Sequence, residues 1–245
     1  MSAGGWAPRR FWTEARAEAV EGGHTVRLDG RPVKTPAKAP LVLPSRALAE
    51  AVAAEWDAQQ EVVDPRRMPV TRSANAALDK VTPQFDEVAD LIAAYGDSDL
   101  LCYRATDPAE LVARQADAWD PWLSWAREHY GARLSATAGV IHVAQPADSL
   151  ERLAAGIRSL SAFELTALHD LVSLSGSLVL GLAVAEAALD PERGWRLSRI
   201  DEDWQIEQWG VDEDAAEAAE AKRAEFLHAH RFLALCRAPD GPVCD

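Results

Sequence analysis

The sequence predicts an α+β protein: a small N-terminal α/β domain with a β-hairpin and a short sheet, followed by a mainly α-helical domain. Short alternating runs typical of strands are confined to roughly the first 44 residues. From residue 82 onward, apolar side chains recur at helical spacing in segments separated by Pro and Gly. We therefore place the first domain at residues 1–78 and the second at residues 79–245.

The strand region centres on an Asp-Gly pair. Residues 25–28 and 31–35 flank Asp29 and Gly30, and a type I′ hairpin turn requires positive φ at both central positions. Pro32 has no backbone N–H, so its strand should lie at an edge of the sheet. Further short strands are expected at residues 11–13, 15–20 and 41–43.

A helix is expected after the strands. Ser45 is a suitable N-cap, and Leu48, Val52 and Trp56 follow at intervals of four residues. This helix should end before Pro65. Residues 65–72 are expected to form a basic, proline-broken connector between the domains.

Caps, prolines and glycines divide the second domain into helices. A capping residue followed by Pro predicts helix starts at residues 82–83, 107–108 and 120–121. Gly96 and Gly131 should end the first and the third of these helices. Residues 134–143 are ambiguous and fit an extended conformation. Ser161 and Glu164 form a capping-box pattern, and Gly176 should interrupt the helix that follows. Other helices are expected at residues 147–160, 178–189, 195–210 and 212–236.

The charge and composition exclude several classes of protein. The net charge of −14 argues against nucleic acid, whose binding needs Lys and Arg, and against an anionic membrane surface. The N-terminus lacks the apolar segment of a signal peptide, and the apolar run 178–185 is too short to span a bilayer. The three cysteines, Cys102, Cys236 and Cys244, lack metal-ligand spacing and fit a reducing compartment. We expect a cytoplasmic protein without stable membrane insertion.

Catalytic motifs are missing from the sequence, including the glycine-rich nucleotide-binding loops and the HExxH zinc motif. His228 and His230 would point apart on a helix, as expected for a solvated face and not for a metal pair. A small hydrolase that uses His169 with a nearby Ser is the alternative function; the candidate nucleophiles are Ser173, Ser175 and Ser177. However, Ser in an apolar helix usually bonds its own backbone, and His169 also fits a hydrogen-bonded core or groove position. We predict no catalytic residue, no metal and no cofactor.

Residues 195–210 are the most unusual segment, with three of the nine tryptophans and four carboxylates. As a single helix, this segment would be apolar on two sides and would need a cover on each. One side would carry Leu197, Ile200 and Trp204, and the opposite side Trp195, Ile206 and Trp209. The second cover could be another helix of this chain or a partner.

The acidic residues of this segment allow three interpretations. Asp203 and Glu207 lie four residues apart and could be an acid/base pair as in glycosidases, a solvated acidic face, or part of a recognition surface. Residues 201–220 contain nine carboxylates and no Lys or Arg. Because Trp is enriched at interface hot spots and charge can steer a basic partner, a binding module fits better than an enzyme.

Taken together, nine segments of the chain resemble a known family. They lie, in order, at residues 10–12, 28–36, 41–44, 54–59, 68–72 with Asn75, 99–104, 119–121, 177–181 and 203–210. In this order and spacing the sequence resembles the ATP12 chaperone family. These are the assembly chaperones that handle the alpha subunit of the ATP synthase catalytic head in mitochondria and alphaproteobacteria.

The resemblance implies a small N-terminal α/β domain followed by an orthogonal helical bundle, with no catalysis and no cofactor. It implies transient binding of the unassembled ATP synthase alpha subunit. This binding masks an apolar surface of the alpha subunit until the beta subunit replaces the chaperone there. The partner-binding residues that the resemblance implies in this chain are Glu202, Asp203, Glu207, Trp209 and Trp56. We add Ile206, which lies on the side of the expected helix that carries Glu202 and Trp209. We expect a monomer. A general binder of apolar surfaces, without preference for one client, is a third interpretation.

Overall fold

The computed structural model describes residues 9–240, which form two compact units. One unit comprises the chain up to Pro83 together with the segment from Arg231 onward, and the other comprises Gln84–His230. An antiparallel sheet lies in the first unit and helices dominate the second, which confirms the predicted α+β class.

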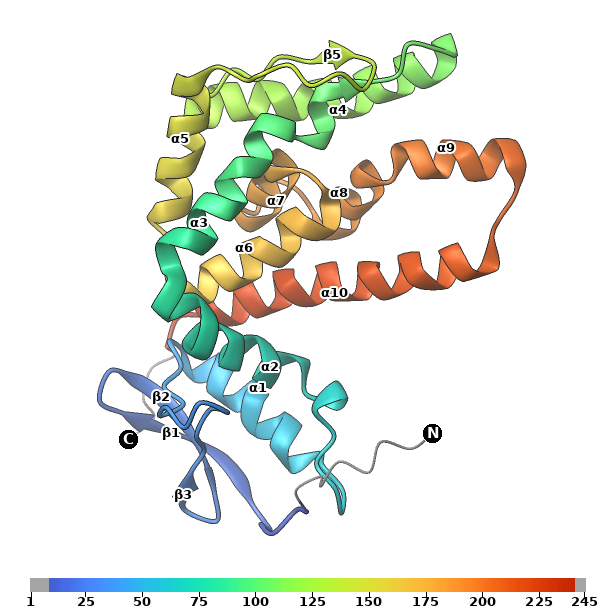
Figure 1. Cartoon of the computed structure of the whole chain (residues 1–245). Helices are drawn as coiled ribbons and strands as arrows, with labels where there is room; N and C mark the ends of the chain where they lie inside the picture. The colour runs from blue at the N-terminus through green and yellow to red at the C-terminus, as the bar shows by residue number, and fades with distance from the viewer. Residues whose placement is uncertain (1–8, 241–245) are drawn as a thin grey trace. The chain divides into compact units, whose positions relative to one another are not determined.

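The sheet of the first unit has three antiparallel strands in the order β1–β2–β3 (Figure 1). They are β1 (Ala15–Val20), β2 (Gly23–Leu28) and β3 (Arg31–Pro32). Asp29 and Gly30 have φ values of 46° and 80°, so the predicted turn is confirmed, and Pro32 lies in an edge strand as expected.

Two expected strands do not form. Residues 41–43 make only one isolated bridge, from Leu43 to His24, because the flanking Pro40 and Pro44 cannot donate to a ladder. Residues 11–13 are not a strand either, since the Thr13 N–H donates to the Asp29 carboxylate instead of to a neighbouring strand.

Helix α1 (Arg46–Asp57) packs against β1 and β2 and forms the core of this unit with them. Ser45 caps it as predicted, its Oγ accepting the Leu48 N–H at 3.0 Å. Val26 of the sheet and Val52 of the helix are both completely buried.

The expected connector at residues 65–72 is instead largely helical. A 3₁₀ turn (Pro65–Arg67) leads into helix α2 (Pro69–Ala76), which continues through a π-helical turn (Ala77–Val81). The carboxylate of Glu55, on α1, accepts the N–H groups of Val70 and Thr71 at 2.8 Å each. Glu55 therefore supplies, from another helix, the hydrogen-bond acceptor that the free N–H groups in the first turn of α2 need. No residue in the sequence around α2 indicates this acceptor.

The second unit is a set of helices joined by turns and, between α4 and α5, by a longer segment that contains β5 (Figure 1). Its helices are α3 (Phe85–Ala94), α4 (Ala109–Tyr130), α5 (Ala147–Arg158), α6 (Ala162–Ser175), α7 (Leu178–Ala185), α8 (Pro191–Ser198) and α9 (Ile200–Trp209). Helix α10 (Glu213–Arg237) begins here, and its turns from Arg231 onward belong to the first unit. Within residues 9–240, no helix is long and apolar enough to cross a membrane.

Short elements connect these helices. The 3₁₀ turns Tyr95–Ser98 and Leu100–Cys102 follow α3. Strands β4 (Tyr103–Arg104) and β5 (Thr137–Ala138) pair in parallel, so residues 134–143 form a strand over only two residues.

Several predicted helix ends are confirmed. Gly131 and Gly176 end α4 and α6 in the left-handed conformation, with φ of 68° and 69°. Ser161 and Glu164 form both hydrogen bonds of the capping box at the start of α6.

None of the three predicted cap-and-proline starts has the expected cap, although α4 does begin directly after Pro108. The Thr82 hydroxyl donates to the Ala77 carbonyl instead of capping a helix, and α3 begins at Phe85. Pro108, not Asp107, occupies the N-cap of α4, while Pro121 lies inside that helix. Tertiary packing outweighs the proline, because the completely buried Trp119 donates its indole N–H to the Leu197 carbonyl at 2.8 Å.

Residues 195–210 are two helices and not one. The chain turns at Arg199 (φ −111°, ψ 9°), between α8 and α9. The Ser198 hydroxyl donates to the Trp195 carbonyl at 2.7 Å, a local bond that competes with the helical ladder. Trp195 is therefore separated from α9 and packs, nearly buried, beside Phe226 of α10.

The start of α7 is held by a buried carboxylate. Asp99 is completely buried, and its side chain accepts from Leu101 N (2.9 Å), Val179 N (2.9 Å) and Ser177 Oγ (2.8 Å). Burial raises the pKa of Asp99 to about 6, against the opposing effect of these hydrogen bonds. Asp99 thus connects the turn after α3 to the N-terminus of α7.

Helices α6 and α7 approach each other closely at Gly181. A Cβ at this position would lie 2.5 Å from Val172 Cγ2 and 3.2 Å from the Val172 backbone nitrogen. We expect Gly181→Ala to lower the free energy of unfolding by about 1–3 kcal/mol, because overpacking exceeds the gain in helix propensity of about 1 kcal/mol. Urea unfolding measures this, and an unchanged or increased stability would show that the two helices separate without strain.

Candidate functional site

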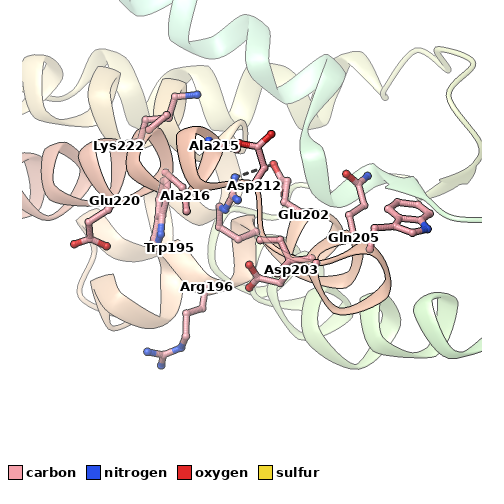
Figure 2. Close-up of a pocket in the computed structure, with 16 residues that line it drawn as sticks. Trp195, Arg196, Glu202, Asp203, Gln205, Asp212, Ala215, Ala216, Glu220 and Lys222 are labelled. Atoms are coloured by element: carbon pink, nitrogen blue, oxygen red, sulfur yellow. Dashed lines mark hydrogen bonds and ion pairs between the residues drawn. The ribbon is translucent and has the colours of Figure 1, made fainter.

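A groove of about 630 Å³ lies between α8 and α9 on one side and α10 on the other (Figure 2). We call it the α9–α10 groove; its lining residues are Trp195, Arg196, Arg199, Glu202, Asp203, Gln205, Ile206, Trp209, Gly210, Asp212, Ala215, Ala216, Ala218, Ala219, Glu220 and Lys222. Four alanines of α10 leave the α9–α10 groove open, since their side chains are too short to fill it. Four of the predicted binding residues line it, namely Glu202, Asp203, Ile206 and Trp209.

The segment that carries this groove has surplus negative charge. Of the nine carboxylates between residues 201 and 220, three make ion pairs: Glu202 with Arg199, Glu207 with Arg114 and Glu220 with Arg223. Among the described residues, no ion pair neutralises the other six, which are Asp201, Asp203, Asp212, Glu213, Asp214 and Glu217. A cationic partner would therefore be attracted to this segment.

Glu207 lies outside the groove and faces α4. Its two carboxylate oxygens accept from the Arg114 guanidinium at 2.8 Å each, and Arg114 also lies 4.9 Å from the centre of the Trp204 ring. The hydrogen bonds from Arg114 lower the pKa of Glu207 and raise that of Arg114. Glu207 thus attaches α9 to α4, a contact that the sequence spacing did not indicate.

The end of α9 is apolar and exposed. Trp209 has 79% of its surface exposed and Val211 has 65%, whereas Ile206 is half-buried within the groove. Gly210, with φ of 92°, ends the helix between these two exposed side chains. An exposed indole beside a groove is a feature of protein-binding surfaces.

Trp56, the remaining predicted residue, lies on α1 in the other unit. Its ring packs edge-to-face on Trp12, with ring centres 5.2 Å apart. Trp12 is buried, and the Arg10 guanidinium lies 5.5 Å from its centre. These contacts place Trp56 in the aromatic packing of the first unit.

The histidine candidates do not form a catalytic site. His169 Nδ1 lies 2.9 Å from Asp170 Oδ1, a bond that raises the pKa of His169. The three candidate serines bond elsewhere: Ser173 to the Asp170 carbonyl, Ser175 to the Leu171 carbonyl and Ser177 to Asp99. Within residues 9–240, no group of three or more His, Cys, Asp or Glu side chains could hold a metal ion.

Sequence reasoning missed two other parts of this surface. Arg114 precedes Glu207 by 93 residues, so no local pattern connects them. Val140 and Ile141, an exposed apolar pair, fall in the segment whose conformation the sequence left ambiguous. An apolar pair directly after Gly139, in a segment without helical spacing, is the only sequence signal that could have indicated the second feature.

The chain is similar in sequence and in structure to several known proteins. A family model described as "ATP12 chaperone protein" matches residues 9–127. Protein atp12, mitochondrial, of Schizosaccharomyces pombe is 26% identical over 241 residues, or 93% of this chain and 82% of that protein. The crystal structure of Atp12 from Paracoccus denitrificans is 51% identical with a TM-score of 0.91, covering 94% of this chain and 98% of that one. The Atu1473 protein of Agrobacterium tumefaciens is 47% identical with a TM-score of 0.87, covering 92% and 85%.

Proposed function

The chain belongs to the ATP12 chaperone family and is an assembly factor for ATP synthase, and from this premise we propose that it binds the unassembled alpha subunit. In doing so, it covers an apolar surface of that subunit until the beta subunit replaces it. A member of this family is a chaperone and not an enzyme, so the alternative of a hydrolase that uses His169 is wrong.

One observation carries the proposal: the α9–α10 groove ends at an exposed tryptophan and lies on a segment with surplus negative charge. Trp209 and Ile206 supply apolar surface, while Glu202 and Asp203 supply charge beside it. A client segment that combines apolar and basic side chains matches both properties. Binding needs no nucleotide, because lowering the concentration of free, aggregation-prone client is a mass-action effect.

Glu207 and Trp56 stay in the proposed partner-binding set. Glu207 is half exposed despite its bond to Arg114, so a cationic client group could compete for it. Trp56 is only partly buried, although its ring also packs on Trp12. We further propose that the chain acts in the cytoplasm. We also propose that it is a monomer, since the acidic segments of two copies would repel each other.

The test is an aggregation assay with isolated alpha subunit and no ATP. We expect this chain, at about a one-to-one ratio, to reduce the light scattering of the alpha subunit by more than half, because it sequesters the free subunit. Unchanged scattering at several-fold excess of this chain would refute the proposal.

Isolated beta subunit and an unrelated aggregating protein are the controls. Neither should be protected, because the groove is proposed to be specific for one client. Equal protection of all three proteins would instead support a general binder of apolar surfaces.

A further inference from the structure

A second hollow, of about 670 Å³, lies on the other side of α9. It is bounded by residues 103–108 with the start of α4, by Gly139 and Val140 beside β5, and by Asp201, Trp204, Gln208 and Trp209 of α9. We call it the α4–α9 hollow. Gln205 and Trp209 line both this hollow and the α9–α10 groove, so the two concavities adjoin across one helix.

The α4–α9 hollow is bordered by the most exposed apolar side chains of the described chain. Val140, Ile141 and Trp209 have 93%, 80% and 79% of their surface exposed. Val140 and Trp209 line the hollow, and Ile141 adjoins Val140 in the chain. Three large apolar side chains grouped at one concavity indicate a surface that another protein covers.

The loop that carries Val140 and Ile141 is held at both ends. On one side, Gly139 N donates to the Arg104 carbonyl at 2.8 Å. On the other side, Asp97 accepts from Gln145 N at 2.8 Å and lies 2.9 Å from His142 Nε2. The apolar pair is therefore presented by a fixed loop, which reduces the entropy lost when a partner binds.

The charge at the hollow is negative. Neither Asp107 nor Asp201 makes an ion pair within residues 9–240; Asp201 accepts from the amide of Gln115, and Asp107 accepts from the Thr106 hydroxyl. Arg104, the cation on this wall, is already bonded to Asp120 and to the Leu101 carbonyl. The hollow thus offers apolar surface together with two carboxylates that lack a cationic partner.

We propose that the client of this chaperone occupies the α4–α9 hollow as well as the α9–α10 groove, so that it contacts α9 on both sides. The occupying segment carries an apolar side chain against Val140 and Ile141 and a Lys or Arg beside Asp107 and Asp201. A second copy of this chain does not fit, because it would bring another acidic segment against these carboxylates. This inference rests on the proposed function, with the alpha subunit as the client.

The test compares binding of isolated alpha subunit to the full chain and to the double variant Val140→Ser with Ile141→Ser. We expect the variant to bind about tenfold more weakly or worse, because two apolar contacts are lost while the fold is kept. The matched control is Leu91→Ser with Val143→Ser, which removes two exposed apolar side chains of the same unit outside the hollow, and it should bind within about twofold of the unsubstituted chain.

A charge variant tests the second part of the inference. Asp107→Asn should weaken binding about threefold at low salt and less at high salt, since the lost attraction is screened. Unaltered affinity in both the serine double variant and Asp107→Asn, with the unsubstituted chain binding well, would overturn the inference and leave the proposed function intact. If the unsubstituted chain does not bind the alpha subunit, both fail. Self-association that the serine double variant abolishes would overturn the inference in favour of a second copy.

Discussion

Replacing Asp99 by alanine should lower the free energy of unfolding by about 3–5 kcal/mol, because three buried donors lose their acceptor. These donors are Leu101 N, Val179 N and the Ser177 hydroxyl, all within 2.9 Å of the carboxylate. Urea unfolding followed by tryptophan fluorescence measures the loss. Asp90→Ala is the control, since Asp90 pairs with Arg158 at the surface and should contribute less than about 1 kcal/mol. Equal losses in the two variants would contradict the buried role of Asp99.

The same carboxylate should make stability depend on pH. Burial raises the pKa of Asp99 to about 6 from a reference of 3.8, so the folded chain keeps a proton that the unfolded chain has released. The stabilisation from this protonation is complete below about pH 4 and is lost as the pH rises through about 6. Asp99→Asn cannot titrate, so between pH 4 and 7 the wild type should lose stability relative to this variant. Parallel pH profiles for the two proteins would show that Asp99 does not titrate in this range in the folded chain.

Reversing the charge of both Glu202 and Asp203 to lysine should weaken binding of the alpha subunit by about 10- to 100-fold at low salt. Both side chains line the α9–α10 groove, and both are exposed. Lysine would replace attraction of a basic client by repulsion, and raising the salt concentration should narrow the difference from wild type. Titration of the isolated subunit at two ionic strengths measures both effects.

The matched control for this variant is Glu213→Lys with Asp214→Lys. It changes the net charge by the same amount within the same acidic segment, but neither residue lines the groove. Glu202 and Asp203 lie in the first turn of α9, and Glu213 and Asp214 lie in the first turn of α10, so the cost to the helix dipole is similar. Equal weakening by both double variants would indicate long-range charge and not contact in the groove. Glu207 is a poorer choice, because its two hydrogen bonds to Arg114 attach α9 to α4, whereas the ion pair of Glu202 joins it to Arg199, only three residues away.

Local sequence patterns predicted the parts of the fold that depend on a few neighbouring residues. The turn at Asp29 and Gly30, the cap at Ser45 and the capping box at Ser161 and Glu164 were predicted because their geometry is set within four residues. The same reasoning failed at Pro121, where a buried tryptophan two residues earlier stabilises a continuous helix. It failed again at Pro69, where Glu55 of another helix supplies the missing acceptor.

The structure brings the expected site residues together only in part. Four of the six expected residues line the α9–α10 groove, whereas Glu207 faces α4 and Trp56 lies in the other unit. The expected single helix placed Trp195 opposite Leu197, but the turn at Arg199 separates both residues from α9. Periodicity assumes an uninterrupted helix, so a break shifts every side chain beyond it.

By itself, the sequence determined the α+β class, the hairpin, the capped helices and the resemblance to a family, because each depends on local spacing or on the order of motifs. Only the tertiary structure decided which distant residues meet. Asp99 reaches Ser177 across 78 residues, and Arg114 reaches Glu207 across 93. It also decided where hollows remain on either side of α9, since they depend on how closely the neighbouring helices pack. Burial, desolvation and hydrogen bonding act through space, and chain spacing does not encode which partners they bring together.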